Sequence, residues 1–263
     1  MRRRPPGWVP PGPVPPGDRG DPELRPAPGE TLDCLSGHWK IFQLRRGHRY
    51  STDDLLTAWY AVASCRRAGL EPRRLLDLGC GIGSVGLMVL WRFLGASLVG
   101  VEAQAVSAGL ARRTARYNGV ADRVEIRHRD FRDPDAFGAD ERFDLVTGSP
   151  PYLEPGEGTR SPLPQRGPCR FEDRGGIEGY ARVAAERLGE GGLFVWVHAT
   201  RYREGNLRAA EAVGLGRIAV RPVVFREGRE SLISLFCASR SDRPVVEEER
   251  PLTVRAADGT WTE

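Results

Sequence analysis

The 263-residue chain has 40% hydrophobic residues, 28% charged residues and a formal net charge of +4. This composition is ordinary for a folded, water-soluble domain, and no apolar run approaches the ~20 residues that a membrane-spanning helix needs. A role inside a membrane is therefore not expected. Proline-rich sequence follows Met1 where a secretory signal would be apolar, which predicts a cytoplasmic protein.

The five cysteines and four histidines are scattered, and none of them has the spacing of a zinc site or a disulfide framework. We therefore expect reduced thiols and no metal. The positive charge comes almost entirely from arginine, since Lys40 is the sole lysine. Such a charge permits a nucleic-acid partner without requiring one.

Three regions follow one another along the chain. Residues 1–29 are dense in proline and glycine, which cannot sustain a helix or a strand ladder, so they are predicted to be a disordered or polyproline-like tail. Residues 30–240 are expected to form the folded domain. Residues 241–263 form a C-terminal tail, in which an edge strand is expected at 252–255.

Within the folded domain, an apolar stripe at helical spacing predicts a helix that begins near Asp53. Beyond it, strands and helices alternate and two strands follow at the end, which predicts an α/β fold. We expect a Rossmann-like, mostly parallel sheet of seven strands in the order 3-2-1-4-5-7-6, with the last strand antiparallel and helices on both faces. The strands are predicted at 75–78, 97–102, 123–128, 143–148, 192–198, 216–226 and 231–238, and the helices at 84–95, 104–117, 177–188 and 203–213.

The first of these strands runs into a glycine-rich loop. Gly79, Gly81 and Gly83 alternate with other residues between the strand and the next helix, where glycine lets the backbone turn sharply and approach a ligand closely. The same stretch also satisfies the G-x-G-x-x-G pattern of dinucleotide-binding enzymes, which is a weak signal on its own.

Two carboxylates favour S-adenosylmethionine over a dinucleotide as the cofactor. Asp77 ends the first strand and Glu102 ends the second. Asp77 suits the amino group and sulfonium of S-adenosylmethionine but would repel a pyrophosphate, whereas Glu102 can accept from two ribose hydroxyls. Asp130 follows the third strand and can accept from the adenine amine, with Phe131 packed nearby. Cys80 and Ala103, next to these groups, complete the expected cofactor contacts.

The fourth strand ends in Ser149, Pro150, Pro151 and Tyr152. The prolines fix the backbone so that the Ser149 hydroxyl and the Pro150 carbonyl can accept from a planar NH2 group, while Tyr152 stacks on that plane. This arrangement predicts methyl transfer to an exocyclic amine, catalysed mainly by positioning, with Ser149 next to both cofactor and acceptor.

These motifs, together with residues 42–56, resemble the bacterial N6-methyltransferases that modify adenine 37 of a valine tRNA, which have the class I methyltransferase fold. The likeness covers most of residues 30–240 and implies that Tyr50, Ser51 and Thr52 lie against the cofactor. A loop around Arg170 and Glu172 also belongs to the likeness. Residues 153–176, which follow the acceptor motif and are rich in Gly, Pro and Arg, are predicted to cover the substrate with Arg160 and Arg170. The chain departs from the family in one respect, because Ser149 stands where Asn is usual.

Other functions stay open on the sequence alone. The same chemistry would serve cytosine N4 of DNA, a protein glutamine amide, a peptide nitrogen or a small-molecule amine. A non-catalytic module that keeps the cofactor fold, or an NADH-dependent dehydrogenase, would explain the glycine loop but not the complete acceptor motif.

Overall fold

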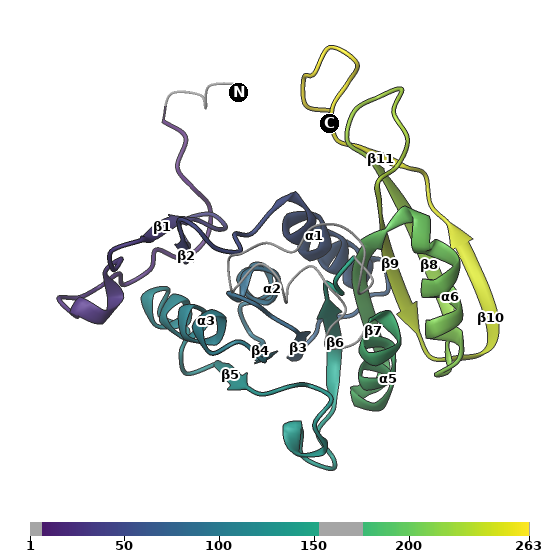
Figure 1. Ribbon diagram of the computed structural model, residues 1–263, viewed down its shortest axis with the longest axis horizontal. Helices are drawn as coiled ribbons and strands as arrows, with labels where there is room; N and C mark the ends of the chain where they lie inside the picture. The colour runs from purple at the N-terminus through teal and green to yellow at the C-terminus, as the bar shows by residue number, and fades with distance from the viewer. Residues whose placement is uncertain (1–6, 153–175, 263) are drawn as a thin grey trace.

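The fold is built around one twisted sheet of nine strands with helices on both faces (Figure 1), in a computed structural model that describes residues 7–152 and 176–262. The strands are β3 (Arg74–Leu78), β4 (Ser97–Glu102), β5 (Val124–His128), β6 (Phe143–Gly148), β7 (Leu188–Ala199), β8 (Leu215–Val224), β9 (Ile233–Ser239), β10 (Ser241–Glu248) and β11 (Leu252–Thr253). The helices that cover them are α1 (Thr52–Arg67), α2 (Ser84–Arg92), α3 (Ala105–Tyr117), α5 (Ile177–Arg187) and α6 (Arg203–Glu211).

The predicted strand order is confirmed. Across the sheet the strands run β5-β4-β3-β6-β7-β9-β8. When β3 to β9 are numbered 1 to 7 along the sequence, this is the order 3-2-1-4-5-7-6. The strand β9 is antiparallel to both β7 and β8, whereas β3, β4, β5, β6 and β7 are parallel. The carboxyl ends of the parallel strands therefore lie along one edge, where open α/β sheets bind their ligands.

Each face of the sheet has its own apolar core. One core lies beneath α1, α2 and α3 and contains Trp39, Tyr60 and Leu87, and the other lies beneath α5 and α6 and contains Trp196 and Phe236. Side chains of β7 alternate between the two cores, as the pleat of a strand requires. Burial on both faces explains why these strands read as nearly continuous apolar runs in the sequence.

A hairpin that the sequence did not predict precedes α1. Its strands, β1 (Glu30–Cys34) and β2 (Lys40–Leu44), are antiparallel. Phe42 in β2 is fully buried, and its backbone N–H donates to Thr114 of α3, while Asn118 at the end of α3 exchanges two hydrogen bonds with the backbone of Lys40. The hairpin thus extends the core over α3.

The N-terminal segment is more ordered than its composition indicates. Residues 7–29 contain a 3-10 turn, η1 (Pro22–Leu24), and Arg116 of α3 forms ion pairs with Asp21 and Glu23 on either side of its start. Arg113 donates to both carboxylate oxygens of Glu30. The expectation of a disordered tail therefore differs from the structure in this part, because the anchoring partners lie on α3, about 90 residues away in the sequence.

The C-terminal segment adds two strands to the sheet. Both β10 and β11 pair with β8 in the parallel direction, and β11 falls where the sequence placed an edge strand. Between them, Glu249 accepts a hydrogen bond from Tyr60 and forms an ion pair with Arg67, both in α1. These contacts tie the end of the described chain to the first helix of the domain.

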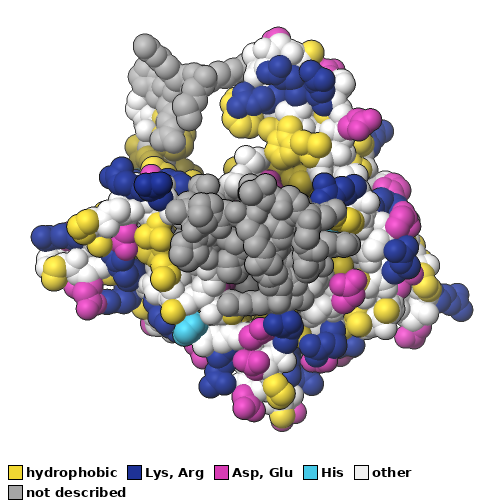
Figure 2. Space-filling model, viewed as in Figure 1, with side chains coloured by type: hydrophobic (Ala, Val, Ile, Leu, Met, Phe, Trp, Pro, Cys, Tyr) yellow, Lys and Arg dark blue, Asp and Glu magenta, His cyan; other side chains and the backbone are white. Residues whose placement is uncertain are grey.

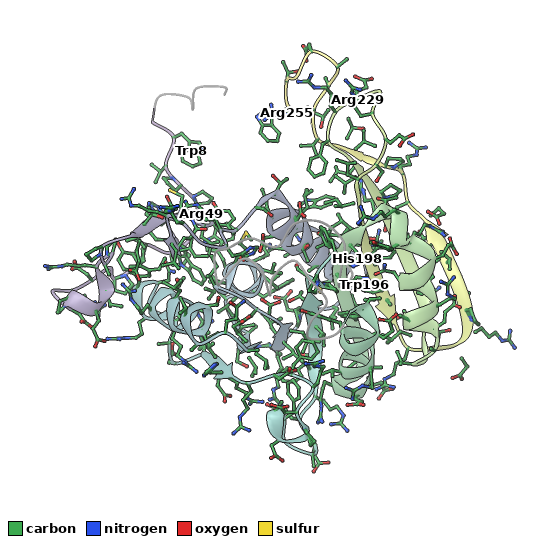
Figure 3. All side chains as sticks on the ribbon, in the orientation of Figure 1. Trp8, Arg49, Trp196, His198, Arg229 and Arg255 are labelled. Carbon is green, nitrogen blue, oxygen red and sulfur yellow. The ribbon has the colours of Figure 1, made fainter. Side chains whose placement is uncertain are left out.

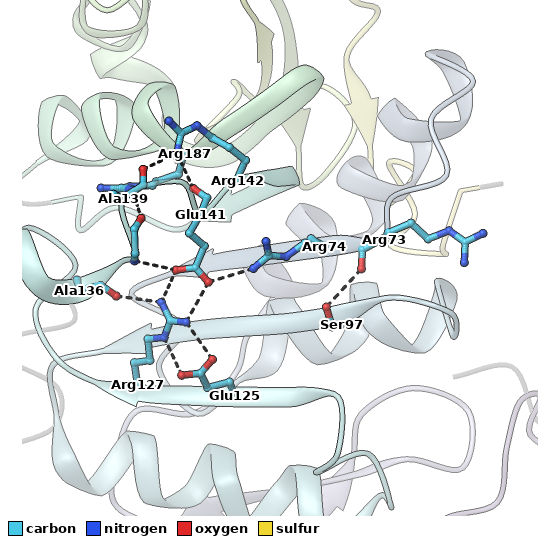
Figure 4. A network of polar contacts seen from close by, with 11 residues as sticks. Arg73, Arg74, Ser97, Glu125, Arg127, Ala136, Ala139, Glu141, Arg142 and Arg187 are labelled. Carbon is cyan, nitrogen blue, oxygen red and sulfur yellow. Dashed lines mark hydrogen bonds and ion pairs between the residues drawn. The ribbon is translucent and has the colours of Figure 1, made fainter.

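A polar network lies near the amino ends of β3 and β6 (Figure 4). Glu141, just before β6, accepts from Arg74 at the start of β3 and from Arg127 in β5. Arg127 also pairs with Glu125, and hydrogen bonding to Arg127 holds the pKa of Glu141 below its usual range. This network ties β5 to the start of β3 and to the segment before β6.

Candidate active site

A cavity of about 810 Å³ opens at the carboxyl ends of β3, β4 and β6. Most of the residues that the sequence singled out lie in its described lining. They are Ser51, Asp77, Gly79, Cys80, Gly81, Glu102, Ala103, Asp130, Phe131, Ser149, Pro150, Pro151 and Tyr152. The structure thus brings the predicted cofactor side and the predicted acceptor side into one cavity.

The glycine loop has a backbone that other residues rarely adopt. Gly79, Gly81 and Gly83 have φ values of +61°, +55° and +84°. A Cβ built on Gly81 would meet no atom within 4 Å, whereas one on Gly79 would lie 2.5 Å from the hydroxyl of Tyr180 in α5. Gly81 therefore leaves room beside the cavity that it lines, and Gly79 makes room for a neighbouring side chain.

Asp77 is held rigidly at the base of this loop. Its side chain is buried and accepts from Thr147 Oγ1 at 2.7 Å and from the Gly86 N–H at 2.9 Å. Burial raises the pKa of Asp77 to about 7. A Cβ on Gly86 would lie 3.0 Å from Asp77 Oδ2, so glycine at that position permits the close approach. The carboxylate is thus fixed in position before any ligand binds.

Glu102 fastens the loop to β4. One carboxylate oxygen accepts from the Gly81 N–H at 2.9 Å, and the other accepts from the Gln104 N–H at 2.6 Å. A carboxylate has about four acceptor positions, so these bonds leave capacity for ligand hydroxyls. On the far side of β4, Asp130 forms an ion pair with Arg132 at 2.6 Å, which orients its carboxyl group beside the cavity.

The acceptor motif contains a buried hydroxyl without a bond. Ser149 lines the cavity, and its buried Oγ has no hydrogen-bond partner among the described residues. A buried polar group without a partner costs free energy and is a mark of a ligand contact. Ser149 therefore fits a ligand that donates a hydrogen bond, as the exocyclic amine of a base would.

Tyr152 is held from two directions. Its hydroxyl donates to Asp53 Oδ2 at 2.9 Å, and its ring meets the His198 ring edge-on at a centroid distance of 5.3 Å. Burial raises the pKa of the Tyr152 hydroxyl and that of the Asp53 carboxyl. The aromatic ring of the acceptor motif is thus placed by residues from α1 and β7.

The start of α1 forms one wall of the cavity. Ser51 caps the helix, and Asp54 accepts from both the backbone and the hydroxyl of Ser51. Asp54 also accepts from Ser84 at the start of α2, at 2.6 Å. This capping box therefore joins the helix that follows the glycine loop to the helix that faces it.

Three of the sequence-predicted cofactor residues do not line the cavity. The Tyr50 hydroxyl donates to the carbonyl of Cys34, Thr52 is the first residue of α1, and Gly83 caps α2. Each of the three is adjacent in sequence to a residue that lines the cavity, and their contact with the cofactor stays a prediction. Arg160 and Arg170 lie outside the described residues.

Several residues of the site could not be recognised in the sequence. Thr147 is one of them, although its register opposite Asp77 follows once β3 and β6 are paired. Tyr180, Asp53 and His198 also contact the predicted residues, and they come from elements distant in sequence. In the described part of the chain no group of three His, Cys, Asp or Glu side chains is placed to hold a metal ion, and no helix there has the length and apolarity to span a membrane.

Known proteins match the chain over its central part. Residues 61–163 match the model of the methyltransferase small domain family. A tRNA1(Val) (adenine(37)-N6)-methyltransferase of Porphyromonas gingivalis is 32% identical over 166 residues, which cover 62% of this chain and 63% of the relative. The enzyme with the same name from Pedobacter heparinus is 25% identical over 225 residues, which cover 86% of this chain and 91% of the relative. The chain therefore spans less than two thirds of the first of these relatives.

Solved structures show the same fold. A predicted O-methyltransferase from Agrobacterium tumefaciens has a TM-score of 0.62 and 21% identity, covering 80% of this chain and 91% of its own. A T. thermophilus 16S rRNA N2 methyltransferase in complex with AdoMet and guanosine has a TM-score of 0.56 and 22% identity, covering 81% of this chain and 50% of its own. At these identities the likeness establishes the architecture alone.

Proposed function

We propose that the chain is a class I S-adenosylmethionine-dependent methyltransferase, which its sequence match and its fold support, and that it methylates an exocyclic amino nitrogen, namely N6 of an adenine in tRNA. The observation that carries this proposal is the buried hydroxyl of Ser149. It has no partner among the described residues, and Ser149 lines the same cavity as Pro150 and the glycine loop.

The residues of the cavity fit S-adenosylmethionine. Asp77 lies at the base of the glycine loop, where a carboxylate attracts the cationic amino group and sulfonium. Glu102 at the end of β4 can accept from the ribose, and Asp130 can accept from the adenine amine. When bound, S-adenosylmethionine supplies a methyl group on a positively charged sulfur, which the lone pair of an amine can displace.

The protein's contribution is to hold the amine. Ser149 Oγ and the carbonyl of Pro150 can each accept a hydrogen bond from one N–H of the amine, and Tyr152 offers a ring on which a planar base can pack. Fixing the nitrogen in line with the methyl group converts a bimolecular encounter into an intramolecular step. The base must leave its stack to enter such a cavity, as in other enzymes that act on exocyclic groups of bases.

A tRNA acceptor is supported by the names of the relatives and by charge. The curated relatives described above are named as methyltransferases of adenine 37 in a valine tRNA. The chain has a net charge of +4, and Figure 2 shows Lys and Arg side chains interspersed with carboxylates on the face in view. Such a surface suits a polyanion recognised partly by shape.

The test is methyl transfer with labelled cofactor. Purified protein and tritiated S-adenosylmethionine are incubated with total tRNA, DNA, a glutamine-rich peptide and free adenosine, and the labelled nucleoside is identified by mass spectrometry. We expect label in N6-methyladenosine of tRNA alone. Label in cytosine or in the peptide would redirect the acceptor assignment, and absence of label from all acceptors would contradict the proposal as a whole.

Ionic strength gives an independent check of the acceptor. Binding of tRNA should weaken steeply as salt rises, because neutralised phosphates release counterions. A small neutral amine would bind with little salt dependence. The Ser149→Ala variant is the matched control, since it should lose transfer while its affinity for tRNA keeps the same salt dependence.

A further inference from the structure

A buried chain of hydrogen bonds lies directly behind the acceptor motif. His198, near the end of β7, has its Nε2 3.0 Å from the carbonyl oxygen of Pro151 and its Nδ1 3.0 Å from Nδ2 of Asn206 in α6. Asn206 in turn accepts from Trp196 Nε1 at 2.8 Å and donates to the carbonyl of Tyr202 at 2.9 Å. Figure 3 shows His198 and Trp196 together on β7, and both are almost fully buried.

The donors and acceptors in this chain of hydrogen bonds allow only one position for the proton of a neutral His198 ring. The Trp196 indole can only donate and the Tyr202 carbonyl can only accept, so the amide oxygen of Asn206 faces Trp196 and its NH2 group faces Tyr202 and His198. The nearer imidazole nitrogen, Nδ1, must then accept. The single proton of a neutral His198 is therefore on Nε2, from which it is donated to the Pro151 carbonyl.

Both ends of this chain of hydrogen bonds are sterically fixed. Trp196 is stacked between Phe194 and Phe236, with ring centroids 4.5 Å and 4.9 Å away. The same His198 ring that donates to Pro151 also packs edge-on against Tyr152 at 5.3 Å. A rigid core thus extends, through Asn206 and His198, to two successive residues of the acceptor motif.

We propose that His198 is a positioning residue, whose neutral Nε2–H tautomer, imposed by Asn206, fixes the Pro151 carbonyl and the Tyr152 ring for the acceptor base. This inference rests on the proposed function for its kinetic consequence. The imidazole does not line the cavity and does not exchange protons with a substrate. It acts through the two residues that it contacts.

The surroundings of His198 favour the neutral form. Burial lowers its pKa, and Arg201 of η3 (Thr200–Tyr202) acts in the same direction, whereas the bond to Pro151 and the charge of Glu178 in α5 oppose the shift. The aromatic rings of Tyr152 and Tyr202 face it at 5.3 Å and 5.5 Å. Protonation would place an N–H on Nδ1 against the NH2 group of Asn206.

The tautomer can be measured without any activity. Long-range 1H–15N correlation spectra distinguish Nε2–H from Nδ1–H imidazole, and the resonance is assigned with His198→Gln. We expect a neutral Nε2–H ring at about pH 7 with a titration below that of a free histidine. An Nδ1–H ring, or an imidazolium at that pH, would overturn the proposal whatever the acceptor is.

The Asn206→Asp variant should reverse the pH dependence. A carboxylate beside Nδ1 favours a proton on that nitrogen, so Nε2 keeps its proton only while the ring is an imidazolium. At saturating cofactor, we expect wild-type kcat for tRNA to fall as pH decreases through the His198 titration, because the new Nδ1–H then opposes the NH2 group of Asn206 and displaces the ring. In the variant we expect kcat to fall as pH rises through the increased pKa of His198, and a profile that matches wild type would contradict the proposed proton assignment.

Replacement of His198 separates positioning from bulk stability. Glutamine can still donate to the Pro151 carbonyl, whereas phenylalanine keeps a ring beside Tyr152 but donates nothing. We expect His198→Phe to lower kcat about 10- to 100-fold with cofactor affinity unchanged, and His198→Gln to recover a part of that loss. Equal activity of the two variants, after correction for the folded fraction, would show a merely structural role.

Failure of the proposal differs from failure of the proposed function. His38, between β1 and β2, does not belong to the described lining of the cavity, so His38→Asn controls for removal of a histidine and should match wild type. If wild type transfers no methyl group, the proposed function fails, and the imidazole spectra together with the Tyr152 ring resonances of His198→Phe still test the positioning. Unchanged Tyr152 resonances in that variant would contradict it.

Discussion

The Tyr152 hydroxyl donates to Asp53 Oδ2 at 2.9 Å, so one buried hydrogen bond joins the acceptor motif after β6 to the first turn of α1. The two residues are 99 positions apart in the sequence. The same helix turn carries Asp54, which accepts from Ser51 and from Ser84 at the start of α2, so the cofactor side and the acceptor side of the cavity share a wall. Positioning on one side is thereby coupled to the other.

Tyr152→Phe removes this bond and keeps the ring. We expect a loss of about 1–3 kcal/mol in the free energy of unfolding, because the Asp53 carboxyl loses this hydrogen-bond donor. Methyl transfer should decrease about 10-fold, and Tyr152→Ala should decrease it further by removing the stacking surface. Urea unfolding and kcat/KM on tRNA measure the two effects.

The double variant Tyr152→Phe/Asp53→Asn separates the two roles of Tyr152. An uncharged amide costs less to bury than a carboxylate, so stability should be partly restored relative to Tyr152→Phe. Full activity in Tyr152→Phe would mean that the Asp53 bond does not position the ring.

Asp77 predicts a pH-dependent affinity for the cofactor. Burial raises its pKa to about 7, so it is largely neutral below that pH and attracts the cationic cofactor less. Affinity for S-adenosylmethionine, measured by calorimetry, should increase as pH rises through 7. In Asp77→Asn it should be about 10-fold weaker at pH 8 and should lack this increase.

Protein stability should respond to the same group in the opposite sense. A carboxyl group whose pKa in the folded state exceeds its unfolded value stabilises the fold below the unfolded pKa, and this contribution is lost as pH rises through the folded pKa. Without cofactor, the melting temperature of wild type should therefore fall relative to Asp77→Asn between about pH 4 and pH 7. A constant difference would mean that Asp77 titrates normally.

Ser149→Ala should reduce activity without reducing stability. The hydroxyl has no partner among the described residues, so its removal leaves no donor or acceptor unpaired there. We expect a melting temperature equal to that of wild type or slightly higher, and kcat/KM about 10- to 100-fold lower. A marked loss of stability instead would assign Ser149 a structural bond.

Ser149→Asn restores the residue that is usual in the resembled family. Its amide oxygen can accept from the same amine but extends further into the cavity. If the amine of adenine is the natural acceptor, Asn should retain much more activity than Ala. Inactivity of both variants would indicate that the cavity requires the shorter side chain.

The Tyr180→Phe substitution should restore stability to one glycine variant and not to another. A Cβ at Gly79 would lie 2.5 Å from the Tyr180 hydroxyl, whereas a Cβ at Gly148 would lie 2.7 Å from the ring carbon Cδ1. Tyr180→Phe should therefore recover part of the stability lost in Gly79→Ala but none of that lost in Gly148→Ala. Strain of about 1–2 kcal/mol should persist at Gly79, since its φ is +61°.

Double-mutant cycles in urea measure this rescue, with Tyr180→Phe alone as the reference. Equal coupling at the two glycines would contradict the geometry. Loss of the melting transition in Gly148→Ala would leave the Gly79 cycle as the test of the hydroxyl contact.

The sequence predicted the sheet well because local pattern determines it. Alternation of strands and helices predicted a mostly parallel sheet with a closing antiparallel hairpin, and the strand order is that of the methyltransferase layout that this pattern matches. In that order β3 and β6 are neighbours, and Asp77 lies opposite Thr147. Polar contacts between distant elements have no such local signal. Asn206 and His198 are eight residues apart, but only the crossing of α6 over β7 makes them partners, and Asp53 read simply as a residue of the first turn of a helix.

The hairpin and the N-terminal segment were missed for a related reason. Phe42 is buried because α3 covers it, and Arg116 anchors η1 through carboxylates about 90 residues earlier. Proline and glycine exclude regular structure, but they do not exclude packing against a preformed helix. The composition therefore predicted that residues 7–29 have little regular secondary structure, but it did not predict that they pack against α3.

The pairing of β8 with β10 and β11 bears on how the protein is made. Until residues 241–253 have left the ribosome, β8 has one unpaired side, and its buried residues Ile218, Val220 and Val223 belong to an open sheet edge. Such edges pair readily with other chains. Residues 241–253 thus cover this edge of β8, and chains truncated before Ser241 should depend on chaperones to avoid aggregation.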